Sequence, residues 1–219
     1  MATTRPQDAL QPEPGAAAAA PPATAVPDRQ DLVDACRRGE PRAYTELYRT
    51  YRTQIAGHLY RLLGGPAELE DALQDTFIEA FRSINRFRGD AKLSTWLHGI
   101  AIHIALRRLR SRGRQLPQTT IEPAPVVADA QQASTLEARR RLARVAAILD
   151  TLAPKKRIVF VLHEIEGHPL NEIAKLVGAP EITVRTRLHY ARKEFFALAA
   201  QDPIFEGLAP AEPADGGAP

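Results

Sequence analysis

The stretch from Pro169 to Lys193 reads PLNEIAKLVGAPEITVRTRLHYARK, and it decides the fold of the second half of the chain. Apolar residues recur in it every three or four positions, at Leu170, Ile173, Ala174 and Val177. This spacing predicts a helix with one apolar face. Gly178 suits the left-handed C-cap of that helix, and Pro180 suits the first turn of a second helix. The stretch therefore predicts a helix-turn-helix.

The second helix of this motif is basic, with Arg185, Arg187, His189, Tyr190, Arg192 and Lys193. Two short helices, a tight turn and a cationic second helix are what a protein needs to enter the major groove of DNA. An ordinary helical hairpin with a solvated basic face has the same local pattern. A separate basic and aromatic cluster upstream favours the DNA-binding interpretation.

Charge is distributed unevenly along the 219 residues, although the formal net charge is only +3. Residues 106–114 contain five arginines and no acidic residue, whereas residues 201–219 contain four acidic residues and neither Lys nor Arg. Clustered positive charge of this kind indicates a polyanionic partner.

Several classes of protein are disfavoured. The single cysteine, Cys36, excludes an internal disulfide and a cysteine-based zinc cage. The histidine pairs 98/103 and 163/168 are five residues apart, which is not the spacing by which one helix face chelates zinc. There is no catalytic constellation and no phosphate-binding loop, so we expect no enzyme activity, cofactor, metal or small-molecule substrate. No apolar run suits a membrane span or signal peptide, and we expect a cytoplasmic protein without membrane insertion.

The organisation predicted is all-α, with two small helical domains and disordered tails. We expect an Ala/Pro-rich tail over residues 1–28, a first domain over 29–113, a flexible linker over 114–134, a second domain over 135–200 and an acidic tail over 201–219. Predicted helices cover residues 31–38, 42–63, 67–84, 95–112 with Ser94 as N-cap, 134–152 and 155–166. The apolar run 158–162 has the propensity of a strand, but an isolated strand would lack a partner, so we predict a helix there.

Several motifs, in order along the chain, resemble those of the bacterial sigma factors of RNA polymerase, in the compact extracytoplasmic-function (ECF) group. In the first half they are EDALQDTF (70–77), FRGD (87–90) and STWL (94–97). In the second half they are EG (166–167), EIA (172–174) and TVRTR (183–187). The first half resembles sigma region 2 and the second half sigma region 4. Two departures from the family pattern, Ile102-His103 and Tyr190, bear on promoter preference.

The loop that begins at Asn85, together with the helix after it, combines the groups needed to hold a base that has left the duplex: an aromatic ring, polar groups and cations. The resemblance implies that this segment captures a flipped base of the promoter −10 element. We expect Phe87 to face solvent and to stack on the base, whereas Trp96 packs in the core. The residues predicted to contact the −10 element are Asn85, Phe87, Arg88, Asp90, Lys92, His103 and Arg107.

In the basic helix of the second half, the resemblance implies contact with the −35 element. Arg185, Thr186, His189 and Tyr190 are expected to contact base edges, and Arg185 suits a bidentate contact with guanine. Thr183 in the first turn suits a phosphate. Arg187, Arg192 and Lys193 are expected on the phosphate backbone.

The resemblance also implies protein partners. Asp71, Gln74 and Asp75, on the polar side of their helix, would dock on the clamp helices of the largest subunit of core polymerase. Further partners are the polymerase flap, promoter DNA and an anti-sigma factor that inhibits the chain.

Two other functions share some of these features. A stand-alone helix-turn-helix regulator would use only the second half of the chain. A nucleic-acid enzyme such as a recombinase would need a nucleophile arrangement that the sequence lacks.

Overall fold

The computed structural model of the chain describes residues 30–112 and 130–206, and these two stretches are helical with no strand. The elements of the first half are α1 (Gln30–Arg37), α2 (Pro41–Leu63), α3 (Leu69–Ser83), the 3₁₀ turn η1 (Ile84–Arg86) and α4 (Leu93–Arg112). Those of the second half are α5 (Ala130–Thr151), α6 (Pro154–Phe160), η2 (Val161–Ile165), α7 (Leu170–Val177), α8 (Glu181–Ala199) and the 3₁₀ turn η3 (Pro203–Phe205). The predicted all-α fold is confirmed.

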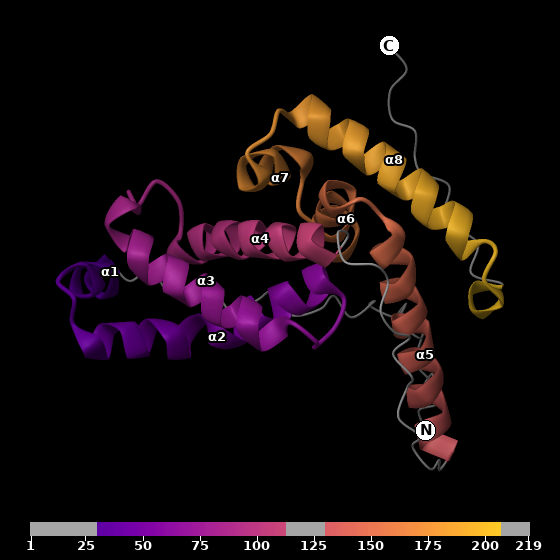
Figure 1. The fold of residues 1–219 in the computed structure, drawn as a ribbon, viewed down its shortest axis with the longest axis horizontal. Helices are drawn as coiled ribbons and strands as arrows, with labels where there is room; N and C mark the ends of the chain where they lie inside the picture. The colour runs from indigo at the N-terminus through magenta and orange to yellow at the C-terminus, as the bar shows by residue number, and fades with distance from the viewer. Residues whose placement is uncertain (1–29, 113–129, 207–219) are drawn as a thin grey trace, which may run out of the picture.

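The first half is a bundle in which α2, α3 and α4 pack pairwise, with α1 against α2 (Figure 1). Its core comes from the apolar stripes of the three long helices, and Leu47, Ile55, Leu59, Leu73 and Leu97 are almost entirely buried. Gly64 caps the C-terminus of α2. Its φ of 75° is the left-handed conformation, which a residue without Cβ adopts most readily.

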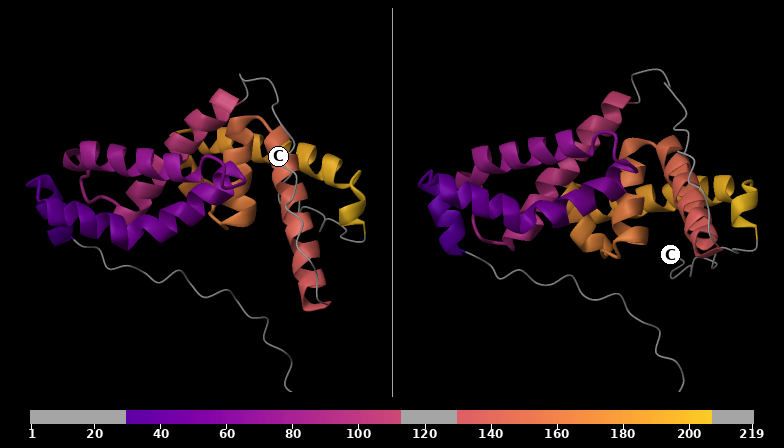
Figure 2. Two further views of the ribbon diagram at one scale, coloured as in Figure 1. Left: turned by 60° about the horizontal axis from the view of Figure 1, so that its bottom comes forward. Right: turned by 90° about the horizontal axis from the view of Figure 1, so that it is seen from below.

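The second half contains the predicted helix-turn-helix. α7 is capped at its C-terminus by Gly178 in the left-handed conformation, and α8 starts directly after Pro180. The apolar run 158–162 is helical, as predicted: it ends α6 and continues into η2, a single π-helical turn. α8 packs on α6, α7 and α5, while the N-terminal part of α5 extends away from the other helices (Figures 1 and 2).

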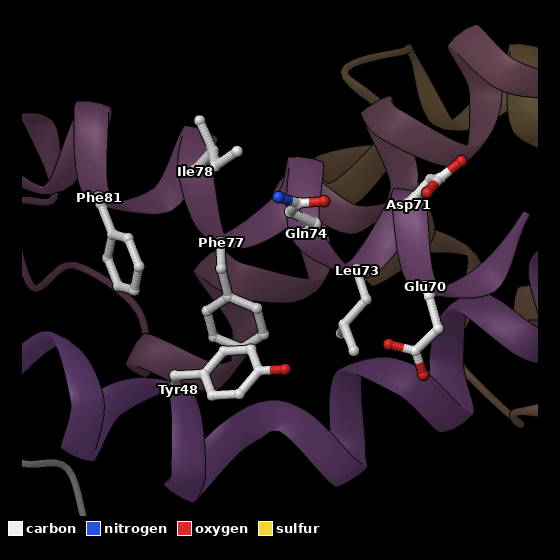
Figure 3. Close-up of a pocket in the computed structure, with 8 residues that line it drawn as sticks. All are labelled: Tyr48, Glu70, Asp71, Leu73, Gln74, Phe77, Ile78 and Phe81. Carbon is white, nitrogen blue, oxygen red and sulfur yellow. The ribbon is translucent and has the colours of Figure 1, made fainter.

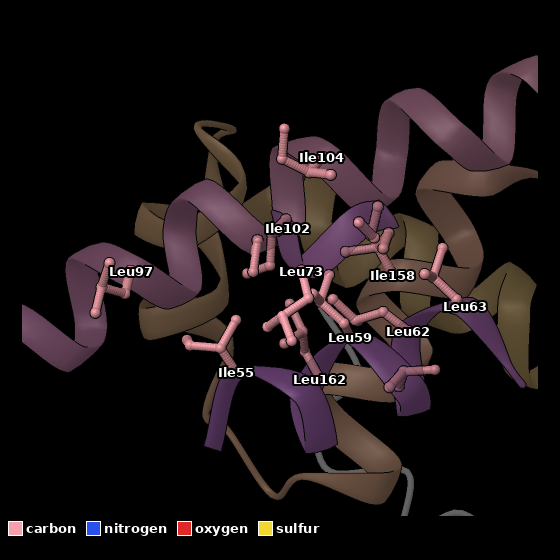
Figure 4. Packing of buried hydrophobic residues seen from close by; sticks show 14 of the residues in the cluster. Ile55, Leu59, Leu62, Leu63, Leu73, Leu97, Ile102, Ile104, Ile158 and Leu162 are labelled. Atoms are coloured by element: carbon pink, nitrogen blue, oxygen red, sulfur yellow. The ribbon is translucent and has the colours of Figure 1, made fainter. Parts of the chain in front are cut away.

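The two halves pack against each other. α6 and α7 contact α4, and η2 contacts α2. Ile158 and Leu162 of the second half lie beside Leu59, Leu62 and Leu63 of α2 in one continuous apolar cluster (Figure 4).

The same contact includes the buried guanidinium of Arg157, which is 1% exposed. Its Nε donates to the carbonyl oxygen of Leu62 at 2.8 Å, at the C-terminal end of α2. Its Nη1 pairs with Asp150 of α5. A cation of the second half thus caps a helix of the first, where the helix dipole favours positive charge.

Some element ends differ from those predicted. α4 begins one residue before Ser94, and the amide of Trp96 donates to the carbonyl of Lys92 instead of to a serine cap. α5 begins at Ala130, inside the predicted linker, and η3 lies within the predicted acidic tail. Asp202 holds that turn, since it accepts from the amide of Ile204 and from Arg144. The predicted tail 1–28, residues 114–129 of the linker and residues 207–219 lie outside the described residues. None of the described helices is long and apolar enough to cross a membrane.

Gly64 provides a test of the contact between the halves, with Gly39 as its matched control. Both have positive φ, 75° and 77°, but a Cβ on Gly39 would meet open space while one on Gly64 would lie 2.3 Å from Nη2 of Arg157. Gly39→Ala should cost about 1–2 kcal/mol of unfolding free energy, because alanine is strained at positive φ. Gly64→Ala should cost clearly more, because the guanidinium must leave the Leu62 carbonyl. Urea denaturation measures both, and equal losses would contradict the placement of Arg157.

Candidate nucleic-acid interface

The surface of α8 is divided into two faces. Val184, Leu188, Ala191 and Phe195 are buried against the other helices. On the opposite face an exposed stripe recurs every three or four residues, made of Ile182, Arg185, Thr186, His189 and Lys193. The side chain of Arg185 is 65% exposed, and among the residues that the structure describes it pairs with Glu181 on the same helix. This stripe can enter a groove without displacing any packed residue.

Ile182 is a residue that sequence reasoning missed. It is 68% exposed and lies on the stripe one turn before Arg185. An exposed β-branched residue among polar neighbours has no packing role, and apolar contact with the methyl group of thymine is one of the ways in which proteins distinguish bases. Ile182 and Val184 are two positions apart, so on a helix they cannot both face the core. That spacing is the signal in the sequence by which Ile182 could have been recognised as exposed.

Other predicted −35 residues are less free. Arg192 lies 2.7 Å from Glu164 of η2, and its side chain is 33% exposed. Tyr190 is exposed at 48%, with the ammonium of Lys156 5.6 Å from its ring centroid. Thr183 and Arg187 are half-buried on the flanks of the stripe.

The prediction that Phe87 faces solvent is wrong. Phe87 is 4% exposed, and its ring centroid lies 5.3 Å from that of Trp96. Trp96 is partly buried against the core, as predicted. The aromatic ring at the centre of the loop therefore supports the loop from inside, because the chain needs an apolar anchor where η1 turns into α4.

The loop is also held from α1, where Arg37 donates to the carbonyl oxygen of Phe87. Gly89 takes a φ of 79° at the turn. Around these anchors the other predicted −10 residues are exposed: Asn85, Arg88, Asp90 and Lys92 in the loop, with His103 and Arg107 on α4.

The arginine cluster at the end of α4 serves two purposes. Arg107 and Arg110 are exposed, but Arg108 and Arg112 are only partly exposed and hold the bundle together. Arg108 bridges Asp75 and Glu68, and Arg112 donates to Glu68 and to the carbonyl of Leu63. Arg114 lies outside the described residues.

A shallow hollow lies between α2 and α3, and its lining side chains are drawn in Figure 3. Tyr48 and Phe77 meet edge to face at its centre, with ring centroids 4.8 Å apart. The lining residues are Tyr48, Glu70, Asp71, Leu73, Gln74, Phe77, Ile78 and Phe81. Asp71 and Gln74 are exposed at the rim, whereas Asp75 is absent from the lining and accepts from Arg108 at 2.6 Å. Asp75 therefore has an internal partner that the sequence analysis did not anticipate.

A cluster of titratable groups lies where the halves meet. Nδ1 of His58 lies 2.9 Å from Oε1 of Glu166, and Nε of Arg61 donates to the same oxygen at 2.7 Å. Burial would raise the pKa of Glu166, but hydrogen bonds from His168 and His58 outweigh it and hold that pKa well below its usual range. The hydrogen bond to Glu166 raises the pKa of His168. Burial, with His58 nearby, lowers the pKa of His98 to about 4.

Within residues 30–112 and 130–206, no group of three or more His, Cys, Asp or Glu side chains is arranged to hold a metal ion.

Comparison with known proteins matches both halves. Residues 47–115 match the model for sigma-70 region 2, and residues 142–195 match that for sigma-70, region 4. The RNA polymerase sigma-H factor of Pseudomonas aeruginosa is 33% identical over 173 residues, which cover 75% of this chain and 90% of that protein. The ECF RNA polymerase sigma-E factor of Haemophilus influenzae is 31% identical over 173 residues, 75% of this chain and 91% of that protein.

A solved structure of CnrH in complex with the cytosolic domain of CnrY is similar to this one. It shares 28% sequence identity, covers 78% of this chain and 97% of that one, and gives a TM-score of 0.55. The chain belongs to the sigma-70 family of RNA polymerase sigma factors, in its ECF group. It is a transcription initiation factor that directs core polymerase to promoters, and the stand-alone regulator is not supported.

The burial of Phe87 leads to a prediction, because Trp96, which it contacts, is the only tryptophan of the chain. Phe87→Ala should cost about 3–5 kcal/mol of unfolding free energy, and it should shift tryptophan fluorescence to longer wavelength as water reaches the indole. Arg88→Ala, at an exposed neighbour, is the control and should change neither. An unshifted spectrum and full stability in Phe87→Ala would show that the ring is free in the loop.

Proposed function

We propose that this sigma factor contacts core polymerase through the hollow on α3, the −10 element through the loop before α4, and the −35 element through α8. The observation that carries the assignment is the exposed stripe on α8, whose other face is buried. An exposed stripe on a packed helix is available to DNA without any rearrangement of that helix.

On the −35 element, the N-terminal half of the stripe suits base edges and its C-terminal end suits phosphates. Arg185 offers the two donors of a guanidinium to guanine, and Ile182 offers a methyl surface to thymine. Thr186 and His189 follow on the same face. Lys193 is exposed and suits the backbone, with Thr183 and Arg187 at the flanks. Arg192 would first have to leave Glu164, so we assign it a smaller share of the phosphate contact than Lys193.

On the −10 element, the exposed groups of the loop would hold the non-template strand. With Phe87 buried, the planar guanidinium of Arg88 becomes the surface on which a flipped base stacks, and Asn85 and Asp90 offer hydrogen bonds to its edge. Lys92, His103 and Arg107 continue the track toward the backbone.

The hollow on α3 suits a helix of the polymerase clamp. Its centre is apolar and aromatic, and its rim carries Asp71, Glu70 and Gln74, which are groups that pair with arginines of a partner. Asp75 pairs with Arg108 and stabilises the bundle, so we assign it a structural role instead of a contact with polymerase. The second half of the chain would meet the flap.

An inhibitory partner is also proposed. The CnrH neighbour is complexed with the cytosolic domain of another protein, and a comparable protein would hold this chain as an anti-sigma factor. We place the activity in the cytoplasm, where polymerase and DNA are.

Arg185 and Lys193 should differ in what they contribute to promoter binding. Arg185→Ala should cost about 1–3 kcal/mol and relax preference at one −35 base pair. Lys193→Ala should weaken binding evenly across sequences and lower the salt slope by about one. Single-base −35 variants, measured with polymerase at two salt concentrations, separate the two effects. A change of base preference in Lys193→Ala, with only salt dependence altered in Arg185→Ala, would reverse our placement of α8.

Asp71 and Glu79 test the polymerase surface as a matched pair, since both are exposed acidic residues of α3 and only Asp71 lines the hollow. Asp71→Arg should weaken binding to core polymerase by about tenfold or more, because it places a cation opposite the arginines of the partner. Glu79→Arg should bind as the unaltered chain does. Fluorescence anisotropy with labelled chain measures both affinities, circular dichroism confirms the fold, and equal affinities would move the docking surface elsewhere.

A further inference from the structure

Gly99 is a glycine in the interior of α4, well away from both ends of that 20-residue helix. Glycine is unfavourable there, because it loses more backbone freedom on folding than any other residue. Its φ does not fall in the left-handed region, unlike that of Gly89 in the loop before α4. A Cβ built on Gly99 would meet nothing within 4 Å. Within the described residues, neither backbone conformation nor packing requires a glycine at this position.

Gly57, inside α2, is a second helical glycine and differs from Gly99 in its surroundings. A Cβ on Gly57 would lie 3.4 Å from Nη1 of Arg61. The far end of an arginine can move by the few tenths of an ångström that this contact requires. Gly57 therefore provides a matched control, a glycine in the interior of a helix of the same domain with a neighbour of its own.

Gly99 lies at the centre of the exposed face of α4. On a helical wheel it falls within about 40° of Lys92, His103 and Arg110, whose side chains are exposed. The buried residues of α4 lie on the opposite side of the helix: Leu93, Leu97, Ala101, Ile102, Ile104, Ala105 and Leu109. The glycine therefore interrupts a line of nitrogen-bearing side chains that begins at the loop assigned to the −10 element.

The imidazole of His103 borders the gap that Gly99 leaves. Its Nδ1 lies 2.6 Å from the carbonyl oxygen of Gly99, one turn earlier. Because a carbonyl oxygen only accepts, Nδ1 carries the proton of this hydrogen bond and the ring is held in one orientation. The ring still leaves the position of a Cβ on Gly99 free. The gap thus has the helix backbone as its floor, with His103 on one side and Lys92 two turns away on the other.

The charge and size of this gap suit the backbone of a nucleic-acid strand. α4 contains no acidic residue, so no group of the helix itself repels a phosphate at this face. Lys92 and His103 are separated by about 16 Å along the helix axis, and a strand that crosses between them passes over Gly99. Close approach of a ligand to the protein backbone is one of the uses for which glycine is suited.

We propose that Gly99 is the point at which the sugar–phosphate backbone of the opened non-template strand lies directly against α4. This inference rests on the proposed contact with the −10 element, and it adds to that contact a residue that carries no side chain. A Cβ would extend about 1.5 Å from the helix backbone into the space of the strand. A misplacement of about 1 Å near reacting groups can lower a rate by about a hundredfold, so we expect alanine at this position to impair promoter opening.

Gly99→Ala separates stability from function. Alanine is favoured over glycine in a helix interior, so Gly99→Ala and Gly57→Ala should each raise the melting temperature, by about 2–4 °C. Promoter opening should fall by about tenfold in Gly99→Ala and stay unchanged in Gly57→Ala. The probe is a promoter selected from a random library by transcription with this chain and core polymerase, and permanganate reactivity of its thymines measures opening. Fluorescence anisotropy should show unchanged binding of both variants to core polymerase.

A second measurement identifies the phosphate. Methylphosphonate replaces one phosphate at a time in the non-template strand of the same promoter, opened in advance by mismatches, and removes one charge at each position. With the unaltered chain and with Gly57→Ala, affinity of the holoenzyme should fall by about threefold or more at one or two neighbouring linkages. In Gly99→Ala these linkages should have no effect, because the strand no longer lies against the helix and the two changes are coupled.

Four results would overturn the inference: a lower melting temperature of Gly99→Ala, which would show a packing role; normal opening by this variant; weaker binding to core polymerase; or a methylphosphonate pattern that is the same with and without the glycine. Failure of the proposed function is a separate result. If no promoter in the library depends on the unaltered chain, the function is rejected and this inference with it, whereas normal transcription by Gly99→Ala rejects the inference alone.

Discussion

The arrangement of the two halves depends on one interaction, the contact of the buried Arg157 guanidinium with the C-terminal end of α2. The guanidinium is 1% exposed and bridges Leu62 of the first half and Asp150 of the second. Removing one partner of such a buried pair typically costs about 3–5 kcal/mol, because a charge is then left without compensation. Gly64 follows from this constraint, since any side chain there would occupy the place of the guanidinium. The position of α7 against α4, and with it the direction of α8, is set by the same docking.

The surfaces that meet DNA and polymerase are arranged around this contact without being covered by it. The stripe of α8, the loop before α4 and the hollow on α3 are all open to solvent. Their supports are internal: Phe87 and Arg37 for the loop, and Arg108 with Asp75 for the end of α3. A rigid scaffold that presents exposed groups is what specific contact requires, since packed neighbours fix the direction of each helix.

Much of this could be predicted from the sequence, because helical periodicity and glycine caps are local signals. The spacing of apolar residues gave the helix-turn-helix with Gly178 at its turn, and the motifs gave the two halves. What local signals could not give was pairing across the chain. Phe87 was expected in solvent because it stands between two arginines, yet Trp96, nine residues further on, covers it. Asp75 was expected to bind polymerase and Arg192 to bind phosphate, and their internal partners, Arg108 and Glu164, are 33 and 28 residues away, too far for a local signal to reveal.

The claim that one chain contacts two promoter elements at once is tested most directly by changing the distance between them. Each added base pair moves the elements apart by about 3.4 Å and turns them by about a tenth of a helical turn. Run-off transcription with core polymerase, this chain and promoters of graded spacer length should show a narrow optimum. Activity should fall steeply within about two or three base pairs on either side, and it should vanish when the −10 element is replaced. Transcription that is equal over a range of about ten base pairs, or that survives loss of the −10 element, would contradict the account.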